Sequence, residues 1–536
     1  MKRISSLSAI IALCCGIGAM TGCSGKPSDG EHKIIVCATT DIHGAYFDCD
    51  YDGNQNATSL SKVSSYIRQL RKDGAKPVLI DCGDALQGDL AAYYYNYINT
   101  QDEHVFMSMA DYIGYDALVV GNHDIETGHD VYDRMLKHFP KNYLAANAID
   151  NDGENRGKCY FTQYSVVKRD GLKIAIIGMT NGNIKSWLPE EKYAGMEFFI
   201  ISNVAQMVVD GVRNAVKPDI VILAVHSGAG HGFPGIENEA EYLAADVKGV
   251  DMVICGHDHK ATLRTVPGLE KDVPLMDAGT KAQFLAQAEF TVNVKKRKVV
   301  GKKATTRIIP MEDVYSDEAF NKAFSKQYEE VKAYADRVIG TLDGDIEFSN
   351  ALDGPSEYIN LVQTVQLKAS GADVSFAAPL TVKGKIAKGD IKFKNLSDLY
   401  RFENQLYVVK MTGKQIKDYL EYSYEMWISA TNAPFNYDSA DGIRYEVDRK
   451  AAKGSRINIM SMCDGSAFDP DKTYKVAMTS YRASGGGNLL NNGAGITQSD
   501  LEIVGKYDDI RSLIGDWISE QGTVTPSVAT NWKWAD

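Results

Sequence analysis

Five apolar, strand-like runs in the first 290 residues each end in side chains with oxygen or nitrogen donors. The runs read KIIVCATTDIHG, PVLIDCGD, DALVVGNHD, DIVILAVHSG and DMVICGHDH, and amphipathic helical stretches such as 59–72 and 202–216 lie between them. Strands that alternate with helices predict a layered α/β domain. Because ligands of open α/β sheets bind at the carboxyl ends of the strands, the five endings are expected to gather into one polar site.

Each ending alone is a common loop motif, since Asp, Asn and Gly are frequent in turns. The ordered set is more specific: Asp-x-His, Gly-Asp, Gly-Asn-His-Asp, His and Gly-His-x-His, each after its own strand. This set resembles the calcineurin-like metallophosphoesterases. The resemblance implies a four-layer αββα domain that binds two divalent metal ions.

The resemblance also assigns seven metal ligands. Asp84 would bridge the two ions, the first ion would take Asp41, His43 and His259, and the second would take Asn122, His226 and His257. Two ions about 3.5–4 Å apart can clamp both oxygens of an in-line displacement at phosphorus. Mixed imidazole and oxygen ligands suit Zn, Mn, Fe or Co. Glycines before three of these ligands are expected to let the backbone turn sharply.

His123 is the imidazole of this set without an assigned metal. In the family, the histidine of Gly-Asn-His stabilises the phosphoryl transition state and protonates the leaving oxygen, and a carboxylate holds its ring. Asp124 and Glu126 both stand close in the sequence. The catalytic set is therefore predicted as His123, Asp124 and Glu126, with the carboxylate that orients the ring left open.

The N-terminus is typical of a targeting segment. Lys2 and Arg3 precede a short apolar stretch, and Met20-Thr21-Gly22-Cys23 resembles a bacterial lipobox, whose cysteine is lipidated. A plain secretory signal is the alternative. We expect a protein of the cell envelope that contacts the membrane through a lipid on Cys23 alone, on the periplasmic face or at the cell surface.

The length of 536 residues exceeds the size of one hydrophobic core, so two domains are expected. The net charge of −12 argues against a nucleic-acid polymer as partner, because binding one requires a basic surface. The expected segments are a signal peptide at 1–22, a tether at 23–32, the metallophosphoesterase domain at 33–310, one long helical connector at 311–340, and a second α/β domain at 341–536.

Two segments of the last 200 residues carry a second resemblance. GDIKFKNLSDLYRFENQLYVVKMTGKQIKDYLE and TSYRASGGGNLL are similar to the nucleotide-binding C-terminal domain of the 5'-nucleotidase family. By that resemblance two aromatic rings sandwich the base. The matching residues are Phe402 and Tyr481 for stacking, Asn404 for the base edge, Gly485 and Gly486 for backbone approach, and Lys383 near the position of a phosphate-binding arginine.

The segments AAPL, YDSADGIRYEVD and SYRASGGG are closer to the bacterial 2',3'-cyclic-nucleotide 2'-phosphodiesterase/3'-nucleotidase branch. We therefore expect an exported phosphoric ester hydrolase that releases nucleoside and phosphate from small nucleotides. A 5'-nucleotidase or nucleotide-sugar hydrolase is the first alternative. The second is a nucleotide-binding surface lipoprotein with an inactive phosphatase domain. The sequence does not indicate an oligomeric state.

Overall fold

The computed structural model describes residues 26–230, 237–402 and 404–535. The expected signal peptide and the lipidation residue Cys23 lie outside these ranges. The chain divides into two compact units, unit 1 up to Val331 and unit 2 from Lys332. Within the described ranges, no helix combines the length and the apolar character that crossing a membrane requires.

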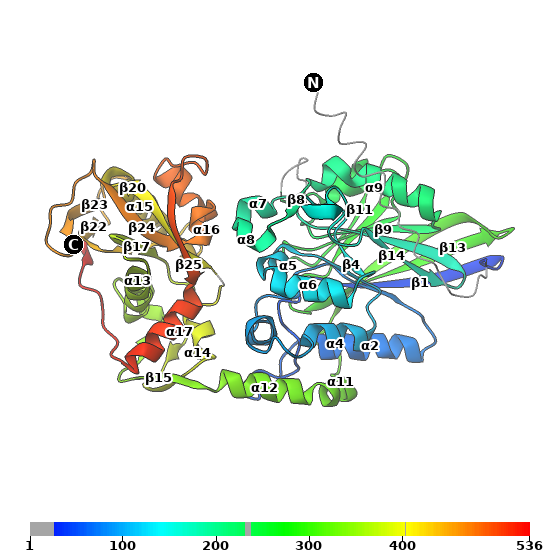
Figure 1. The fold of residues 1–536 in the computed structure, drawn as a ribbon, viewed down its shortest axis with the longest axis horizontal. Helices are drawn as coiled ribbons and strands as arrows, with labels where there is room; N and C mark the ends of the chain where they lie inside the picture. Colours follow the sequence, from blue (N-terminus) through cyan, green and yellow to red (C-terminus); the bar gives the residue numbers. More distant parts are fainter. Residues whose placement is uncertain (1–25, 231–236, 403, 536) are drawn as a thin grey trace, which may run out of the picture. The chain divides into compact units, whose positions relative to one another are not determined.

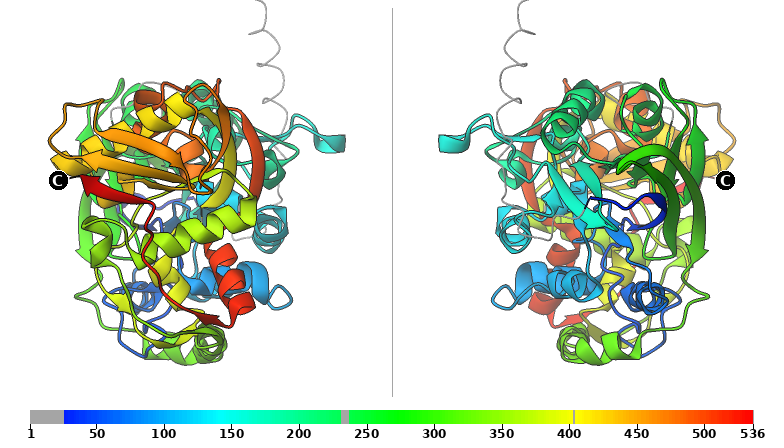
Figure 2. Two further views of the ribbon diagram at one scale, coloured as in Figure 1. Left: turned by 90° about the vertical axis from the view of Figure 1, so that its left-hand side faces the viewer. Right: turned by 90° about the vertical axis from the view of Figure 1, so that its right-hand side faces the viewer.

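Unit 1 contains two six-stranded sheets. The first has the order β14 (Lys298–Pro310), β13 (Phe284–Lys295), β1 (Gly30–Thr39), β2 (Val78–Asp81), β3 (Ala117–Val119) and β4 (Tyr143–Leu144). The second has the order β11 (Thr262–Val266), β12 (Val273–Asp277), β10 (Met252–Cys255), β9 (Ile220–Val225), β7 (Leu172–Met179) and β6 (Tyr164–Arg169). The hairpin of β13 and β14, green in the right-hand view of Figure 2, forms one edge of the first sheet.

The two sheets of unit 1 pack face to face. One buried apolar cluster joins their facing sides and includes Val36 of β1, Ile80 of β2, Ile174 of β7 and Ile222 of β9. Helices cover the outer faces, with α9 (Ile201–Val216) on one side and α2 (Leu60–Lys72) with α4 (Val105–Ile113) on the other (Figure 1). This arrangement confirms the predicted four-layer αββα architecture.

The inner strands of both sheets run parallel. β1, β2 and β3 pair in parallel in the first sheet, and β7, β9 and β10 do so in the second. Their carboxyl ends therefore meet at one end of the double layer. Shorter α-helices of unit 1 include α3 (Leu90–Tyr93), α5 (Asn122–Glu126), α6 (His129–His138), α7 (Ile184–Trp187), α8 (Glu190–Tyr193) and α10 (Ala240–Asp246), and β5 (Ala148–Asp150) pairs with β8 (Met196–Phe198).

The single long helix predicted over 311–340 is wrong. The structure has α11 (Glu318–Ala323) and α12 (Ser325–Ala335), followed by strand β15 (Val338–Leu342). Asp317 caps α11, because its side chain accepts from the backbone N–H groups of Ala319 and Phe320. Its backbone N–H also donates to the Ser61 hydroxyl, so the residues before α11 are anchored on unit 1 and do not extend the helix.

Unit 2 is built on a five-stranded sheet of order β21 (Ser439–Asp441), β17 (Val374–Ala377), β24 (Thr473–Thr479), β20 (Gln405–Thr412) and β25 (Ile503–Asp509). Smaller sheets are β23 (Ile457–Met462), β22 (Ile443–Asp448) and β27 (Trp532–Ala535); β19 (Gly389–Lys392), β15 and β26 (Thr523–Val524); and β16 (Ile346–Glu347) with β18 (Lys385–Ile386). Its helices are α13 (Glu357–Ser370), α14 (Asn395–Leu399), α15 (Gly413–Ser429), α16 (Ser480–Ala483) and α17 (Ile510–Gln521). In the left-hand view of Figure 2, yellow-green α13 lies against the larger sheet. The second domain is therefore α/β, as predicted.

Candidate dinuclear metal centre

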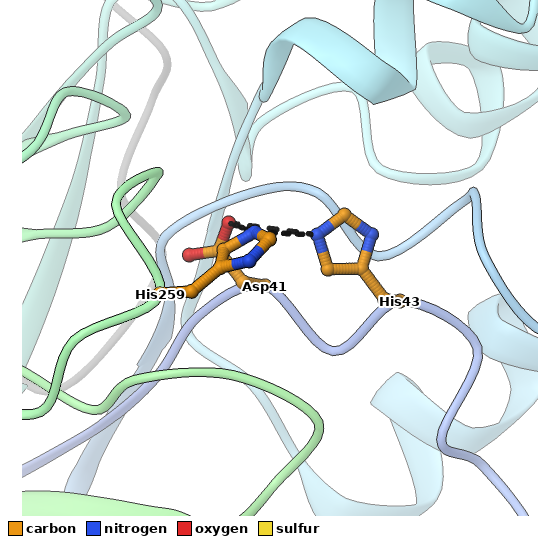
Figure 3. Close-up of side chains that lie close together, drawn as sticks. All are labelled: Asp41, His43 and His259. Atoms are coloured by element: carbon orange, nitrogen blue, oxygen red, sulfur yellow. Dashed lines mark hydrogen bonds and ion pairs between the residues drawn. The ribbon is translucent and has the colours of Figure 1, made fainter. Parts of the chain in front are cut away.

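The first cluster of polar side chains contains Asp41 and His43, which follow β1, and His259, which follows β10 (Figure 3). The Nε2 atoms of His43 and His259 lie 3.0 Å apart. Asp41 Oδ1 lies 3.3 Å from His259 Nε2 and 3.7 Å from His43 Nε2. Three potential ligand atoms from the two sheets thus converge on one point.

The second cluster contains Asp84 after β2, His226 after β9 and His257 after β10. His226 Nε2 lies 3.0 Å from Asp84 Oδ2 and 3.1 Å from Asn122 Oδ1. The structure therefore brings the seven sequence-predicted ligands into two groups, with Asp84 grouped with His226 and His257 and Asn122 beside His226.

The hydrogen bonds around these clusters test whether cations fit between the ligands. Among the described residues, Asp41 Oδ1 and Asp84 Oδ2 are buried and have no hydrogen-bond partner. His226 uses its Nδ1–H to donate to the Cys82 carbonyl at 2.8 Å, so in the neutral ring the Nε2 lone pair faces Asp84 Oδ2. Two lone pairs at this distance repel unless a proton or a metal ion lies between them. The donor set fits divalent transition metals.

The backbone at these ligands is strained. Five of the seven ligands have a positive φ: Asp41 (50°), His43 (46°), Asp84 (58°), His257 (90°) and His259 (59°). The left-handed region costs a residue with a side chain about 1–2 kcal/mol. Strain of this kind persists where the surrounding structure imposes it, typically at functional sites. The concentration of strain marks these loops as a site rather than as ordinary turns.

Glycine is required before three ligands, although not always for the predicted reason. Gly83 has a φ of +99°, so it does allow a sharp turn before Asp84. At Gly121 a Cβ would lie 2.0 Å from Asp84 Oδ1, and at Gly256 it would lie 1.9 Å from Thr40 Oγ1. Gly121 has an extended φ of −93°. At these two positions glycine provides space beside the ligands rather than conformational freedom.

The carboxylate beside His123 is Glu126. His123 Nδ1–H donates to Glu126 Oε2 at 2.5 Å, since residues three apart share a face of α5. Asp124 lies elsewhere: its two oxygens accept from the backbone N–H groups of Gly121, Asp84, Ala85 and Leu86. The structure thus places Asp124 as a clamp on the loop that carries Asp84, and of the two carboxylates that the sequence left open it places Glu126 against the ring of His123.

Two imidazoles carry shifted pKa values. Desolvation disfavours the charged ring of His123, but the carboxylates of Asp84 and Glu126 outweigh it and raise the pKa of His123 to about 10. Burial likewise opposes the charge on His226, and Asp84 outweighs it, so the pKa of His226 rises to about 10. The centre therefore attracts positive charge strongly, as a site for cations requires.

The base-binding residues predicted in unit 2 lie beyond one end of the inner strands of the larger sheet. Phe402 and Asn404 precede β20, Tyr481 follows β24, and these strands pair so that Leu406 lies opposite Thr479. Phe402 and Tyr481 are 44% and 43% exposed, which leaves ring surface open to a ligand. Lys383 is exposed in the loop after β17, which runs parallel to β24.

The loop after α16 supports Tyr481. A Cβ on Gly486 would lie within 2.4–2.5 Å of three Tyr481 ring carbons, so only glycine fits beneath the ring. Gly485 has a φ of +98°, a conformation that favours glycine. Buried Arg482 makes two hydrogen bonds to the Asp438 carboxylate and donates to the carbonyls of Phe435 and Gly486. The sequence analysis did not single out Arg482, because a lone arginine in a short helix has no distinctive spacing.

The sequence analysis also missed two residues beside His257. Glu237 Oε1 accepts a hydrogen bond from His257 Nε2 at 2.6 Å, and Trp187 stacks on the same ring. Neither residue follows a strand directly, so the pattern of polar strand ends could not indicate them.

Comparisons with known proteins agree with this geometry. The calcineurin-like phosphoesterase family model matches residues 34–261, and the model of the 5'-nucleotidase C-terminal domain matches residues 338–492. Fold and site thus define a calcineurin-like metallophosphoesterase, a class of phosphoric ester hydrolase that uses a dinuclear metal centre. Together the two matches span more than half of the chain, which belongs to the family that joins this domain to a 5'-nucleotidase C-terminal domain.

Individual relatives are more distant. The 2',3'-cyclic-nucleotide 2'-phosphodiesterase/3'-nucleotidase of Haemophilus influenzae is 26% identical over 98% of this chain and 90% of its own length. The trifunctional nucleotide phosphoesterase protein YfkN of Bacillus subtilis is also 26% identical, over 93% of this chain but only 39% of its own length. The crystal structure of a Staphylococcus aureus protein with alpha-ketoglutarate superposes with a TM-score of 0.75 at 21% identity, covering 94% of this chain and all of the other, and shows the same fold.

Proposed function

We propose that the chain is an exported hydrolase that opens 2',3'-cyclic nucleotides and removes phosphate from 3'-nucleotides with two divalent metal ions. The observation that carries the proposal is the pair of buried carboxylate oxygens without partners, Asp41 Oδ1 and Asp84 Oδ2, each facing imidazole nitrogens. Zn, Mn, Fe and Co all suit these ligands.

The metal ions, when bound, polarise the phosphoryl oxygens and lower the pKa of the attacking water. The chain's own residues hold the ligands in place. Asp84 Oδ1 accepts from the backbone N–H of His123 at 2.8 Å, whereas Oδ2 has no hydrogen-bond partner and would be available to hold the ions. Asp41 Oδ2 accepts from Thr40 Oγ1 and from the backbone N–H of His257, so Oδ1 would be the oxygen available to a metal ion.

His123 acts as the general acid in this proposal. Glu126 holds the proton at Nδ1, so Nε2 is the nitrogen that stabilises the phosphoryl group and donates a proton to the leaving oxygen. Asp124 contributes indirectly, because it holds the loop that carries Asp84.

The base binds in unit 2 between the exposed rings of Phe402 and Tyr481, with Asn404 at its edge and Gly485 and Gly486 allowing close approach. Stacking on aromatic rings is worth about 1–3 kcal/mol per base and tolerates every base. Lys383 provides a cation for phosphate, although without the planar fork of an arginine. The name of the Haemophilus influenzae relative supports the choice of cyclic and 3'-phosphate substrates.

The location in the cell envelope is proposed from the N-terminal sequence. Lys2, Arg3 and the apolar stretch after them act as a signal peptide, and Cys23 is lipidated. Mass spectrometry of the membrane-extracted protein would show a diacylglyceryl adduct on Cys23. A mature chain without that mass would leave a plain secretory signal.

The substrate proposal is tested with soluble protein that starts after Cys23, stripped with chelator and reloaded with Mn or Zn. Phosphate and nucleoside release are compared for 2',3'-cyclic AMP, 3'-AMP and 5'-AMP, with His123→Ala as control. Metal-dependent turnover led by the cyclic and 3' substrates is expected, and the control should lose at least 10²-fold in kcat.

Two other results would overturn parts of the proposal. Turnover led by 5'-AMP would keep the metal chemistry and make the chain a 5'-nucleotidase. No turnover with any substrate, together with retained nucleotide binding, would indicate an inactive nucleotide-binding lipoprotein.

A further inference from the structure

His257 is held by two side chains that belong to neither metal cluster. Its Nε2–H donates to the Glu237 carboxylate at 2.6 Å. The indole of Trp187 stacks on the imidazole of His257, with ring centroids 5.4 Å apart and an angle of 15° between the planes. The imidazole therefore has a fixed position and a fixed proton before any ligand binds.

The partner of His257 differs from those of two other predicted ligands, His43 and His226. His43 Nδ1–H donates to the Gln87 carbonyl at 3.0 Å, and His226 Nδ1–H donates to the Cys82 carbonyl at 2.8 Å. Both of these rings present Nε2 to the cluster. In His257 the proton lies on Nε2 instead, so the lone pair is on Nδ1. The partner is also a charged side chain rather than a backbone carbonyl.

Glu237 is held in place by the strand ends around it. Its backbone carbonyl accepts from Ser227 Oγ at 2.8 Å and from Asn181 Nδ2 at 2.9 Å. Ser227 directly follows the ligand His226, and Asn181 follows β7. An ordinary surface ion pair between mobile side chains lacks such anchoring. The backbone of Glu237 is thus positioned by the same sheet that positions the ligands.

We propose that Glu237 is a positioning residue for the second metal ion, an inference that rests on the proposed dinuclear centre. The carboxylate keeps His257 in the tautomer whose Nδ1 binds the ion, and it makes the ring a stronger ligand. Carboxylate partners of metal-binding histidines typically contribute 10–100-fold to metal affinity or activity. Trp187 limits rotation of the ring about its side-chain bonds.

The test compares E237A and E237Q with the wild type. Each protein is loaded with Mn and dialysed against graded chelator, and the Mn bound per chain is measured by mass spectrometry. Electron paramagnetic resonance reports separately whether the two ions remain coupled. We expect E237A to lose one of two ions at 10–100-fold lower chelator concentration than the wild type, and to lose the coupled signal with it. E237Q should fall between them, because its amide oxygen accepts from Nε2–H without the charge.

Asp133 provides the matched control. Its carboxylate lies 3.2 Å from His129 Nδ1 on a half-exposed part of unit 1, and among the described residues neither side chain belongs to a group that could hold a metal ion. D133A and D133N should retain both ions as the wild type does.

Three results would contradict the inference. If E237A and E237Q retain both ions at wild-type chelator concentrations, Glu237 does not position His257. If the Asp133 variants lose an ion as readily, the effect is one of surface charge. If the wild type itself fails to bind two ions, the dinuclear centre is wrong, which is a failure of the proposed function and is seen without any variant.

Discussion

Asp124→Asn separates the clamp role of Asp124 from a catalytic role. In the structure the two carboxylate oxygens accept four backbone hydrogen bonds of 2.8–3.1 Å, and Asp124 is 2% exposed. Asparagine keeps one acceptor oxygen but replaces the other with an NH₂ group that faces two N–H donors. Two buried N–H groups then lose their partner.

The cost follows from those two groups. Leaving a buried donor unpaired costs about 1–3 kcal/mol, so Asp124→Asn should destabilise unit 1 by about 2–6 kcal/mol. Asp50→Asn is the control, since Asp50 Oδ1 accepts from the backbone of Asp52 and Asn54 at an exposed position, where an amide oxygen can replace it. The control should change stability by less than about 0.5 kcal/mol.

The assay is urea unfolding of the metal-free protein. Circular dichroism follows the whole chain, and tryptophan fluorescence reports mainly on unit 2, because four of the five tryptophans lie beyond Lys332. We expect the variant to shift the dichroism transition and to leave the fluorescence transition unchanged. A wild-type midpoint for Asp124→Asn, with turnover as low as that of His123→Ala, would refute the clamp and indicate that Asp124 acts on His123.

Three further predictions concern other parts of the chain. Gly486→Ala should displace the ring of Tyr481 and weaken base stacking by about 1–3 kcal/mol. The KM for nucleotides should then rise about 5–150-fold, while hydrolysis of p-nitrophenyl phosphate, which has no base, is unchanged. Equal effects on both substrates would contradict this prediction. Arg482→Lys loses the bidentate contact to buried Asp438 and should destabilise unit 2 by about 3 kcal/mol, measured in urea unfolding by tryptophan fluorescence. A destabilisation below about 0.5 kcal/mol would argue against this role of Arg482. Burial favours the neutral form of Asp251, but two lysines outweigh burial and hold the pKa of Asp251 below its ordinary value. The stabilisation from the charged carboxylate is therefore present above about pH 4 and is lost as the pH falls. Asp251→Asn should cost stability at pH 7 and little at pH 2 in urea unfolding, and a cost that does not depend on pH would be the contrary result.

Local pattern determined much of this protein. Strands end where apolar runs give way to polar residues. The sequence alone therefore predicts the five strands, the helices between them and the seven candidate ligands. The ion pair of His123 with Glu126 also follows from local geometry, because residues three apart share a helix face, whereas Asp124 turns toward the loop that begins at Asp84.

Tertiary structure decided the rest. The ligands come from two different sheets, and only the face-to-face packing of those sheets brings His259 within 3.0 Å of His43. The predicted long connector helix starts only at α11, because Asp317 caps that helix and its backbone N–H donates to the Ser61 hydroxyl. Glu237 reaches His257 from a loop with no periodic pattern. Contacts of this kind depend on packing between segments far apart in the chain, and no local hydrophobic period encodes them.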